Sequence, residues 1–472
     1  HVTDRRQRQM CIRDRFMISP CLLDKVNKDI RSRMMKKKIA VIGSGMAGLA
    51  AGWLCRKAGT DVTIFEAQSS RGMDFHTQFL DGNDGRSGHV DVPLRVMSPH
   101  AWPTVLKLCD ILDVKTFEVD TPVACSWLPQ ETWFRSIKFQ FGSREIPWAP
   151  LRYLIRPETY RMLSGFLQIY RAHPKSLDSD LTLEEFTKQN QVDPIFWKGL
   201  LYPLLTTICT CDEKTIDQWP AGQILDLLQK IVFGSRLRRL QGGTKALAEK
   251  LGTDLTWKSG IRVEELSEKS SGTFLRSQNN EFGPFDYVIC AVQANHLNFL
   301  PEQYHRERKI LDAFPYDSGT LWVHRDERFM PENRKDWSPL HYQVKKDFSQ
   351  SMFSVWVNPI EPTIATHAPV FQTWNPIFEP EAEKTLSAVP MERAVVTREN
   401  QKLLSELDLL HQGPLRKVFF CGSYAASGVP LLESAVRSAI KVVGYLGYDP
   451  LNQKIVDDVP SQDSNSEISL AA

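Results

Sequence analysis

The sequence contains no uninterrupted apolar run of the ~18 to 20 residues that a membrane-spanning helix requires. We therefore expect no transmembrane segment. Any contact with a membrane would have to be peripheral, and the sequence leaves such a contact open.

The chain also lacks the cysteine pattern of a disulfide framework. Its nine cysteines are scattered and odd in number, which in a chain of this size is typical of reduced thiols and favours a cytoplasmic, reducing compartment. Cys209 and Cys211 resemble half of a metal site, but no second Cys/His pair follows at ligand spacing. We interpret both as buried free thiols and expect no metal.

A basic face of the kind that binds nucleic acid is missing as well. The net charge is +2, but residues 1–38 carry 12 Lys or Arg and 4 acidic residues, so the rest of the chain has a net charge of −6. We therefore expect no nucleic-acid partner. The length of 472 residues, with 42% hydrophobic and 24% charged residues, predicts a soluble globular protein of two domains.

The two ends of the chain differ in composition from the middle. Residues 1–33 show no clean periodicity and resemble translated non-native sequence, with Met17, Met34 and Met35 as candidate start positions. An Arg-rich transit segment is the alternative and leaves organellar targeting open, although Asp4 and Asp14 argue against it. Residues 451–472 are polar and are predicted to be a disordered tail.

Residues 38–66 form the most informative stretch of the sequence. A β-branched apolar run at 39–42 leads into Gly43, Gly45 and Gly48, and a helical pattern then ends before Gly59. A second apolar strand at 62–65 ends at Glu66. This order of strand, GxGxxG turn, helix, strand and acid is the fingerprint of a dinucleotide-binding βαβ unit.

Each glycine of the motif has its own predicted task. Gly43 permits the tight turn, Gly45 lets the backbone approach a pyrophosphate, and Gly48 allows close contact between helix and strand. Glu66 would accept a ribose hydroxyl. A glycine turn that only packs a helix on a sheet is the alternative, and it explains Gly48 but neither Gly45 nor Glu66.

The remaining pattern predicts further elements in chain order. Residues 67–101 indicate loops and short strands, 102–112 a helix, and 150–233 a mostly helical region whose aromatic residues pack in the core. Gly242 and Gly243 open a short helix, and strands are predicted at 260–266, 273–277 and 285–292, the first two forming a hairpin. Segments within 319–376 predict the sheet of a second domain, and a strand at 417–422 precedes a helix at 431–446.

Several of these motifs together resemble the flavin amine oxidase and carotenoid desaturase superfamily. The resemblance rests on residues 38–66, the Gly242-Gly243 turn, the strand that follows Asp286, and the segment VFFCGSYAASGVPLLESAVRSAI. The spaced HxDxxxMPxxRxxW run from His324 to Trp337 is similar to one branch, the predicted NAD/FAD-binding amine-oxidase-like proteins. That branch is related to the flavoprotein half of some cyclopropane-fatty-acid synthases, and the resemblance covers roughly residues 36–447.

The resemblance implies an α/β fold, with a Rossmann-type FAD-binding domain and a discontinuous second α+β substrate domain. The implied FAD-binding parts are 34–105, 236–300 and 405–450, and the implied substrate-domain parts are 106–235 and 301–404. It further implies that FAD contacts a set of residues in both halves of the chain: Gly43, Ser44, Gly45, Met46, Ala47, Gly48, Glu66, Arg71, Val263, Gly422, Ser423, Glu433, Ala435 and Val436. Backbone N–H groups near Gly422 and Glu433 would face the pyrophosphate and the flavin N1/C2 edge. Any doubly wound fold also closes with such a strand and helix, so this segment has a purely structural alternative.

The departures from the superfamily pattern limit the functional prediction. Thr320 stands near the position where amine oxidases place a lysine beside the flavin, so amine oxidation is not predicted. His324, Asp326, Arg334 and Trp337 are interpreted as a structural network rather than as catalytic groups. No catalytic residue is assigned.

The resemblance implies an FAD-dependent oxidoreductase that transfers hydride from a C–H bond of an apolar, lipid-like substrate to flavin N5. Two alternatives stay open from the sequence. One is an NAD(P)-dependent dehydrogenase, and the other is a flavin-binding accessory protein without turnover, serving a methyltransferase partner.

Overall fold

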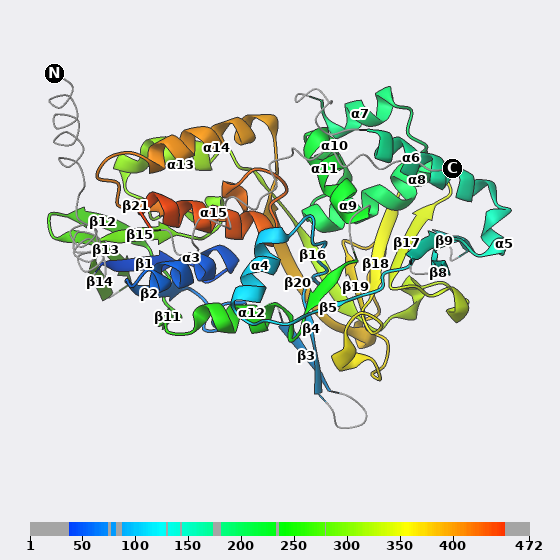
Figure 1. Cartoon of the computed structure of the whole chain (residues 1–472), viewed down its shortest axis with the longest axis horizontal. Helices are drawn as coiled ribbons and strands as arrows, with labels where there is room; N and C mark the ends of the chain where they lie inside the picture. Colours follow the sequence, from blue (N-terminus) through cyan, green and yellow to red (C-terminus); the bar gives the residue numbers. More distant parts are fainter. Residues whose placement is uncertain are drawn as a thin grey trace, which may run out of the picture.

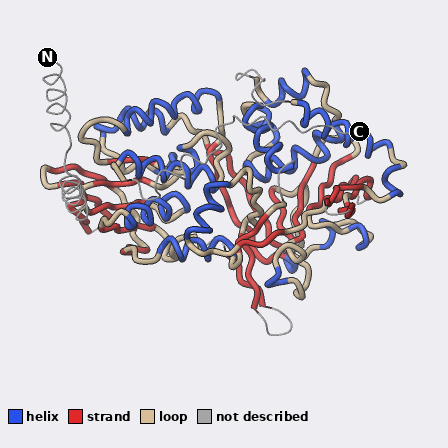
Figure 2. The backbone as a smooth tube through the Cα atoms, viewed as in Figure 1, coloured by secondary structure: helices blue, strands red, loops and turns tan. Residues whose placement is uncertain are grey.

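Two sheets organise the molecule, and each has its own helical cover (Figure 1). The computed structural model describes residues 37–73, 77–81, 87–128, 131–141, 144–172, 181–232, 236–278 and 280–448. The predicted leader and tail lie outside these residues. Figure 2 shows the strands gathered into two regions with helices packed around them.

The first sheet is parallel and has the strand order β11-β2-β1-β15-β21. Its strands are β1 (Lys38–Ile42), β2 (Asp61–Glu66), β11 (Thr256–Ser259), β15 (Tyr287–Cys290) and β21 (Val418–Phe420). Because all strands run in one direction, their carboxyl ends meet at one edge, which is where doubly wound sheets bind ligands. The Rossmann-type half of the predicted fold is confirmed.

Successive side chains of β1 are buried in two different apolar clusters, one on each face of this sheet. Ile39 and Val41 pack in one apolar cluster, with the helices α3 (Met46–Lys57), α12 (Gly243–Gly252) and α15 (Leu432–Tyr445). Ala40 and Ile42 pack in another, with side chains of α13 (His305–Leu311), α14 (Arg398–His411) and the small sheet of β12 (Glu265–Lys269), β13 (Gly272–Ser277) and β14 (Asn280–Phe285). The result is a three-layer domain.

The second sheet is mixed and has seven strands in the order β20-β16-β19-β18-β17-β6-β7. Their bounds are Thr385–Ala394, Tyr316–His324, Phe371–Trp374, Ser351–Trp356, Leu340–Lys345, Val123–Leu128 and Glu131–Arg135 in that order. The sequence predicted this sheet from 319–376 but missed β20, which follows that region, and β6 and β7, which the chain supplies from far upstream.

The predicted helical region packs beside the second sheet. It contains α5 (Leu151–Leu154), α6 (Pro157–Arg171), α7 (Leu183–Gln189), α8 (Pro194–Phe196), a π-helical turn (Trp197–Leu201), α9 (Tyr202–Cys209), α10 (Glu213–Asp217) and α11 (Ala221–Val232). Among the described helices of the whole chain, none combines the length and the apolar character needed to cross a bilayer.

Three short antiparallel ladders and one helix connect these parts. The ladders are β3 (Thr77–Asp81) with β4 (Ser87–Asp91), β8 (Ile137–Phe141) with β9 (Arg144–Trp148), and β5 (Thr116–Glu118) with β10 (Arg238–Leu240). Helix α4 (Pro103–Ile111) occupies the segment where a helix was predicted.

The strand predicted at 260–266 is wrong. Gly260 adopts a positive φ of 72° directly after β11, and the N–H groups of Gly260 and Ile261 bond to the carbonyls of Gln68 and Glu66. β12 begins only at Glu265, and it forms the predicted hairpin with β13, to which β14 adds a third strand. The third strand, β14, was missed because its polar residues and the Gly283-Pro284 pair hide any apolar alternation.

Candidate functional site

In the glycine turn at the carboxyl end of β1, Gly43 and Gly48 have the turn and packing roles that the motif predicts. Gly43 has a φ of 98°, and a Cβ there would lie 2.9 Å from the carbonyl oxygen of Ala291. A Cβ on Gly48 would lie 2.0 Å from the carbonyl oxygen of Gly43. Backbone conformation and packing therefore account for both glycines.

Gly45 has no such structural explanation. Its φ is −66°, which any residue adopts, and a Cβ would meet no atom within 4 Å. It is the N-cap of α3, and no side chain caps this helix end. The glycine thus leaves open space at a helix N-terminus, and the residues present fit a bound pyrophosphate there.

Ser44 connects the glycine turn to the end of β2. Its hydroxyl donates a 2.5 Å hydrogen bond to the Glu66 carboxylate, which also accepts the Ser44 N–H at 3.0 Å. The hydroxyl oxygen of Ser44 in turn accepts a hydrogen bond of 3.1 Å from the N–H of Gly72. The second carboxylate oxygen of Glu66 accepts the N–H of Gln68 at 2.9 Å. Glu66 therefore lies at the end of β2, as predicted, and these hydrogen bonds fix its carboxylate. The carboxylate oxygens retain lone pairs that could accept a ribose hydroxyl.

Arg71 and Val263 lie near this end of the sheet. Arg71 is exposed, and its guanidinium lies over the ring of Trp257, with 5.7 Å between guanidinium carbon and ring centroid. The Gly72 hydrogen bond to Ser44 keeps Arg71 close to the glycine turn. Val263 is buried in the cluster that contains Ile42 and Phe65, beside the carboxyl ends of β1 and β2.

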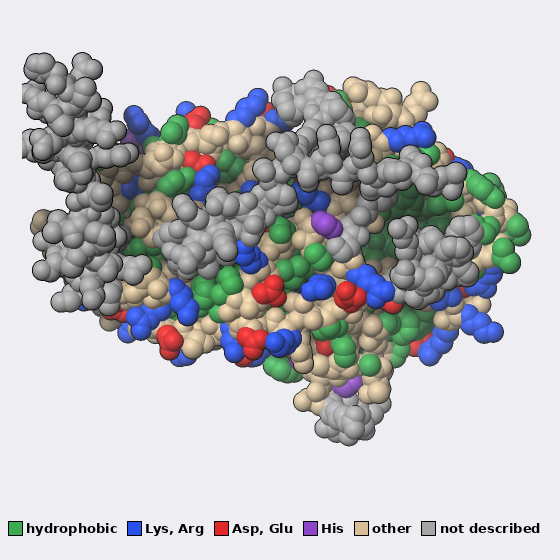
Figure 3. Space-filling model, in the orientation of Figure 1, with side chains coloured by type: hydrophobic (Ala, Val, Ile, Leu, Met, Phe, Trp, Pro, Cys, Tyr) green, Lys and Arg blue, Asp and Glu red, His purple; other side chains and the backbone are tan. Residues whose placement is uncertain are grey.

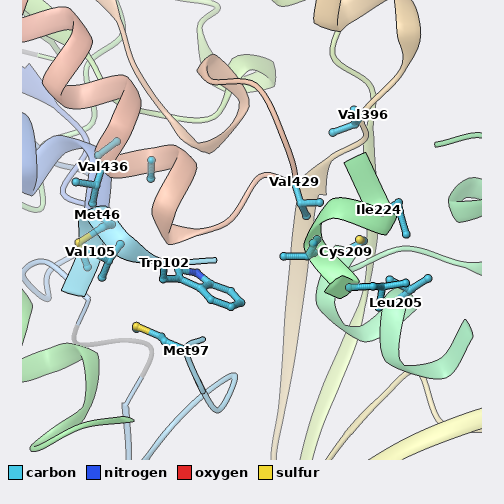
Figure 4. Packing of buried hydrophobic residues seen from close by; sticks show 14 of the residues in the cluster. Met46, Met97, Trp102, Val105, Leu205, Cys209, Ile224, Val396, Val429 and Val436 are labelled. Atoms are coloured by element: carbon cyan, nitrogen blue, oxygen red, sulfur yellow. The ribbon is translucent and has the colours of Figure 1, made fainter. Parts of the chain in front are cut away.

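The second predicted cofactor segment meets the first one in space. Gly422 follows β21 at the same sheet edge, and its N–H and carbonyl both bond to the hydroxyl of Ser438, at 3.0 and 2.9 Å. Ser423 begins the short turn Ser423–Ala425. Ala435 and Val436 are buried on α15, and Figure 4 shows Val436 beside Met46, the first residue of α3. Met46 and Ala47 belong to the same buried cluster.

The side chain of Glu433 has a task that the sequence did not reveal. Its carboxylate accepts the N–H groups of Thr104 and Val105 at 3.0 to 3.2 Å and so caps the start of α4. Burial raises the pKa of this carboxyl, although these hydrogen bonds oppose the shift. Glu433 therefore contributes to the site by fixing α4 against α15, while the first-turn N–H groups of α15 stay candidates for phosphate contact.

An apolar cluster extends from the glycine turn toward the second sheet. Figure 4 shows two facing groups of buried residues in it: Met46, Met97, Trp102, Val105 and Val436 in one, and Leu205, Cys209, Ile224, Val396 and Val429 in the other. The Trp102 ring points toward the second group. Side chains from both halves of the molecule thus belong to one buried apolar cluster next to the proposed cofactor site.

Two arginines that the sequence did not single out lie deep in the molecule. Arg95 donates to the Thr244 hydroxyl at 3.0 Å, and Arg393 donates to the Thr210 hydroxyl at 3.1 Å and to the Pro430 carbonyl. Burial lowers the pKa of Arg95 to about 10, with a further contribution from the positive charge of Arg393 and an opposing one from Asp91. Burial also lowers the pKa of Arg393. Both side chains stay half-buried rather than fully packed, and no local sequence pattern marks either one.

His324 and Asp326 lie in a buried hydrogen-bond network, whose arginine is Arg328 rather than Arg334. Asp326 accepts the Arg328 side chain and the Glu381 N–H, and although burial raises its pKa, these bonds hold it at about 2. Burial lowers the pKa of His324 to about 4, and its Nδ1 accepts the Asp326 N–H. Arg334 pairs instead with Glu327 at 2.6 Å.

The described cysteines are free and buried, Cys209 and Cys211 included. Within the described ranges, no group of three or more His, Cys, Asp or Glu side chains is arranged to hold a metal ion.

Comparisons with known proteins place the chain in a family. The model of the family described as flavin containing amine oxidoreductase matches residues 46–384. An L-glutamate oxidase precursor from Streptomyces viridosporus is 22% identical over 378 residues, which cover 65% of this chain and 56% of that protein. The chain thus spans little more than half the length of that relative.

Solved structures share the fold at low sequence identity. Putrescine oxidase bound to putrescine has a TM-score of 0.57 at 14% identity, with 88% of this chain and 99% of that chain covered. A CLA-producing fatty acid isomerase from P. acnes has a TM-score of 0.55 at 14% identity, with 86% and 98% covered. Because the family match covers most of the chain, the protein belongs to the flavin-containing amine oxidoreductases.

Proposed function

We propose that this oxidoreductase oxidises a C–H bond of an apolar, lipid-like substrate, with flavin N5 as the hydride acceptor. The observation that carries the proposal is the buried apolar cluster beside the glycine turn, to which Trp102 and Met97 contribute from one side and Leu205 and Val429 from the other. Apolar surroundings of this kind favour an apolar substrate over a charged amine.

FAD supplies the redox chemistry when it is bound, so the chain has to bind, orient and exclude water. We assign the ADP half to Gly43, Ser44, Gly45, Met46, Ala47, Gly48 and Glu66, with Arg71 and Val263 close by. We assign the flavin end to Gly422, Ser423 and the first turn of α15, which contains Glu433, Ala435 and Val436. Trp102 and its apolar neighbours would keep water from the reacting carbon.

The experiment is anaerobic reduction of the bound flavin by candidate substrates. Long-chain alkenes, alcohols and fatty acids should bleach the visible flavin absorbance, whereas short diamines should not. Reduction by diamines alone would contradict the proposal. A Trp102→Ala variant that retains its flavin should show a raised KM for apolar substrates, because it removes part of the lining.

A narrower candidate within this class is a substrate that carries a carboxylate. Arg95 and Arg393 are deep, both are cationic, and neither is paired with a carboxylate by a hydrogen bond or ion pair within the described residues. An anionic group on the substrate would offset their charges. Replacing Arg393 by Met should raise the KM for fatty acids and leave that for the matching alcohols unchanged.

The comparisons bear on one alternative from the sequence and leave three other expectations as predictions. The family membership favours a flavin over the nicotinamide cofactor of the alternative dehydrogenase. The domain boundaries, the methyltransferase partner and the cytoplasmic location stay predictions. Co-purification from the native host would test the partner.

A further inference from the structure

An apolar ridge covers the exposed side of α5 and α6. It consists of Leu151, Ile155, Tyr160, Leu163 and Leu167, whose exposed fractions are 81%, 83%, 62%, 49% and 45%. The sequence predicted that Tyr160 would pack in the core, and that prediction is wrong. Figures 1 and 3 place α5 and its hydrophobic side chains at the end of the molecule opposite the five-stranded sheet.

Helix α6 has two apolar faces, and only one is used for packing. Thr159, Met162, Gly165 and Ile169 are buried, and a Cβ on Gly165 would lie 2.1 Å from the Phe196 ring. The other face carries Tyr160, Leu163 and Leu167 at helical spacing and is exposed. Large apolar side chains that line up on a solvent-facing helix mark an interaction surface rather than a core.

Basic side chains accompany the ridge. Residues 151–171 contain four arginines and one acidic residue, a net charge of +3, whereas residues 39–472 as a whole are negative. In Figure 3, Lys and Arg side chains gather along the rim below the hydrophobic end. The ridge therefore combines apolar side chains with positive charge.

Three acidic residues from other segments face these arginines and offset the net charge of +3 of residues 151–171, but the arginines keep further N–H donors. Arg152 pairs with Asp336, Arg156 with Glu131 at 3.4 Å, and Arg161 with Asp193 at 2.8 Å. The pairs with Asp336 and Glu131 use one terminal nitrogen of each guanidinium, so further N–H groups stay available. Arg152 and Arg156 also line a polar surface hollow of about 290 Å³, which they share with the acidic side chains of Glu131, Glu332 and Asp336.

We propose that α5 and α6 dock peripherally on a phospholipid bilayer, with the ridge in the acyl region and the arginines at the headgroup phosphates. The combination of exposed Leu, Ile and Tyr with flanking Arg is that of an interfacial helix, whose cationic side chains reach back to the phosphates. A second protein chain would cover the ridge without calling for the basic rim. The inference stands on the ridge itself and does not depend on the substrate.

Vesicle co-sedimentation of the full, FAD-loaded chain tests the proposal. The probes are vesicles of phosphatidylcholine alone and of phosphatidylcholine with phosphatidylglycerol. Two pairs of substitutions, Leu151→Ser with Ile155→Ser and Leu163→Ser with Leu167→Ser, should each lower the partition coefficient at least about tenfold. The matched control is Leu409→Ser with Leu415→Ser, because these leucines are also exposed, at 69% and 96%, but lie elsewhere.

Retained flavin content and an unchanged thermal midpoint show that a variant is folded. Stronger binding to the anionic vesicles, lost in Arg156→Gln with Arg171→Gln, supports the role of the arginines. The proposal is overturned if the wild-type chain binds neither vesicle, or if the control pair loses as much binding as the ridge pairs. Concentration-dependent dimerisation that disappears in the ridge variants, without vesicle binding, would overturn it in favour of a second copy of the chain.

Discussion

The hydroxyl of Ser44 donates a 2.5 Å hydrogen bond to the carboxylate of Glu66, so the glycine turn and the end of β2 are fixed to each other. The same oxygen accepts the N–H of Gly72 and so holds a third segment of the chain at this point. Ser44 is fully buried. One small side chain therefore positions both the predicted ribose acceptor and the segment that carries Arg71.

Ser44→Ala should destabilise the protein and weaken its hold on FAD. The substitution leaves the buried N–H of Gly72 without its acceptor, which costs about 1 to 3 kcal/mol of unfolding free energy. Urea denaturation and the ratio of flavin to protein after dialysis measure the two effects. Ser271→Ala, on the exposed turn between β12 and β13, is the control and should change neither. Full flavin retention in Ser44→Ala would contradict the positioning role.

Gly45→Ala should lose FAD binding, whereas Gly48→Ala should lose stability. A methyl on Gly45 meets no protein atom, so the apoprotein should keep its thermal midpoint within a few degrees while FAD is lost. A methyl on Gly48 would lie 2.0 Å from the Gly43 carbonyl oxygen, so this variant should be destabilised whether or not FAD is present. Absorbance of bound flavin and differential scanning calorimetry separate the two outcomes. If Gly45→Ala copurifies with a full complement of flavin, the open space is not the pyrophosphate site.

Elements with a strong local pattern were predictable from the sequence. The βαβ unit of β1, α3 and β2, the strand β21 and the helix α15 all lie where apolar runs and glycines indicated. Strands β6 and β7 were not, because β6 pairs with β17 some 200 residues downstream, β7 pairs only with β6, and this long-range pairing alone places both in the second sheet. The prediction also missed the polar strand β14, but here the reason is local. β14 lies at the edge of a small sheet and needs no alternation of apolar and polar residues.

The site residues also divide into those that a local motif predicts and those that only long-range contacts bring into place. Gly43, Gly45, Gly48 and Glu66 belong to a contiguous motif whose chemistry can be read in order. Arg95, Arg393 and the capping role of Glu433 depend on contacts between segments about 150 to 330 residues apart, and no spacing rule encodes them. Tyr160 shows the limit for helices, because the aromatic residues of the helical region were all predicted to pack in the core, and the helical pattern does not tell which face of α6 the protein buries.

Arg239→Met should destabilise the fold strongly. The Arg239 side chain is fully buried, donates to Glu361 at 2.5 Å and lies 3.7 Å from Asp91. Its removal leaves two buried carboxylates without their cation, which typically costs about 3 to 5 kcal/mol. Arg236→Met is the matched control, because Arg236 forms an exposed pair with Glu118 at 3.0 Å and such pairs contribute at most about 1 kcal/mol. Equal unfolding free energies for the two variants would contradict this argument.

Stability should decrease as the pH falls below about 6.5, because several histidines are buried in the neutral form. Burial lowers the pKa of His324 and His341 to about 4, and burial together with the charges of Arg416 and Lys441 lowers that of His411 to about 3. Between these values and the unfolded value of 6.5 the unfolded chain binds more protons than the native one. Each histidine therefore removes about 1 kcal/mol of unfolding free energy per pH unit in this window.

His411→Gln isolates one of these contributions. Glutamine cannot be protonated, and its side-chain oxygen can still accept the Phe420 N–H that now bonds to the histidine Nε2 at 3.1 Å. Urea unfolding of both proteins between about pH 7 and pH 5 should therefore give a slope against pH that is smaller for the variant by about one proton. An identical slope would show that His411 is protonated in the folded protein. A loss of stability that is the same at every pH would mean that the substitution disturbs packing against Phe420 rather than proton binding.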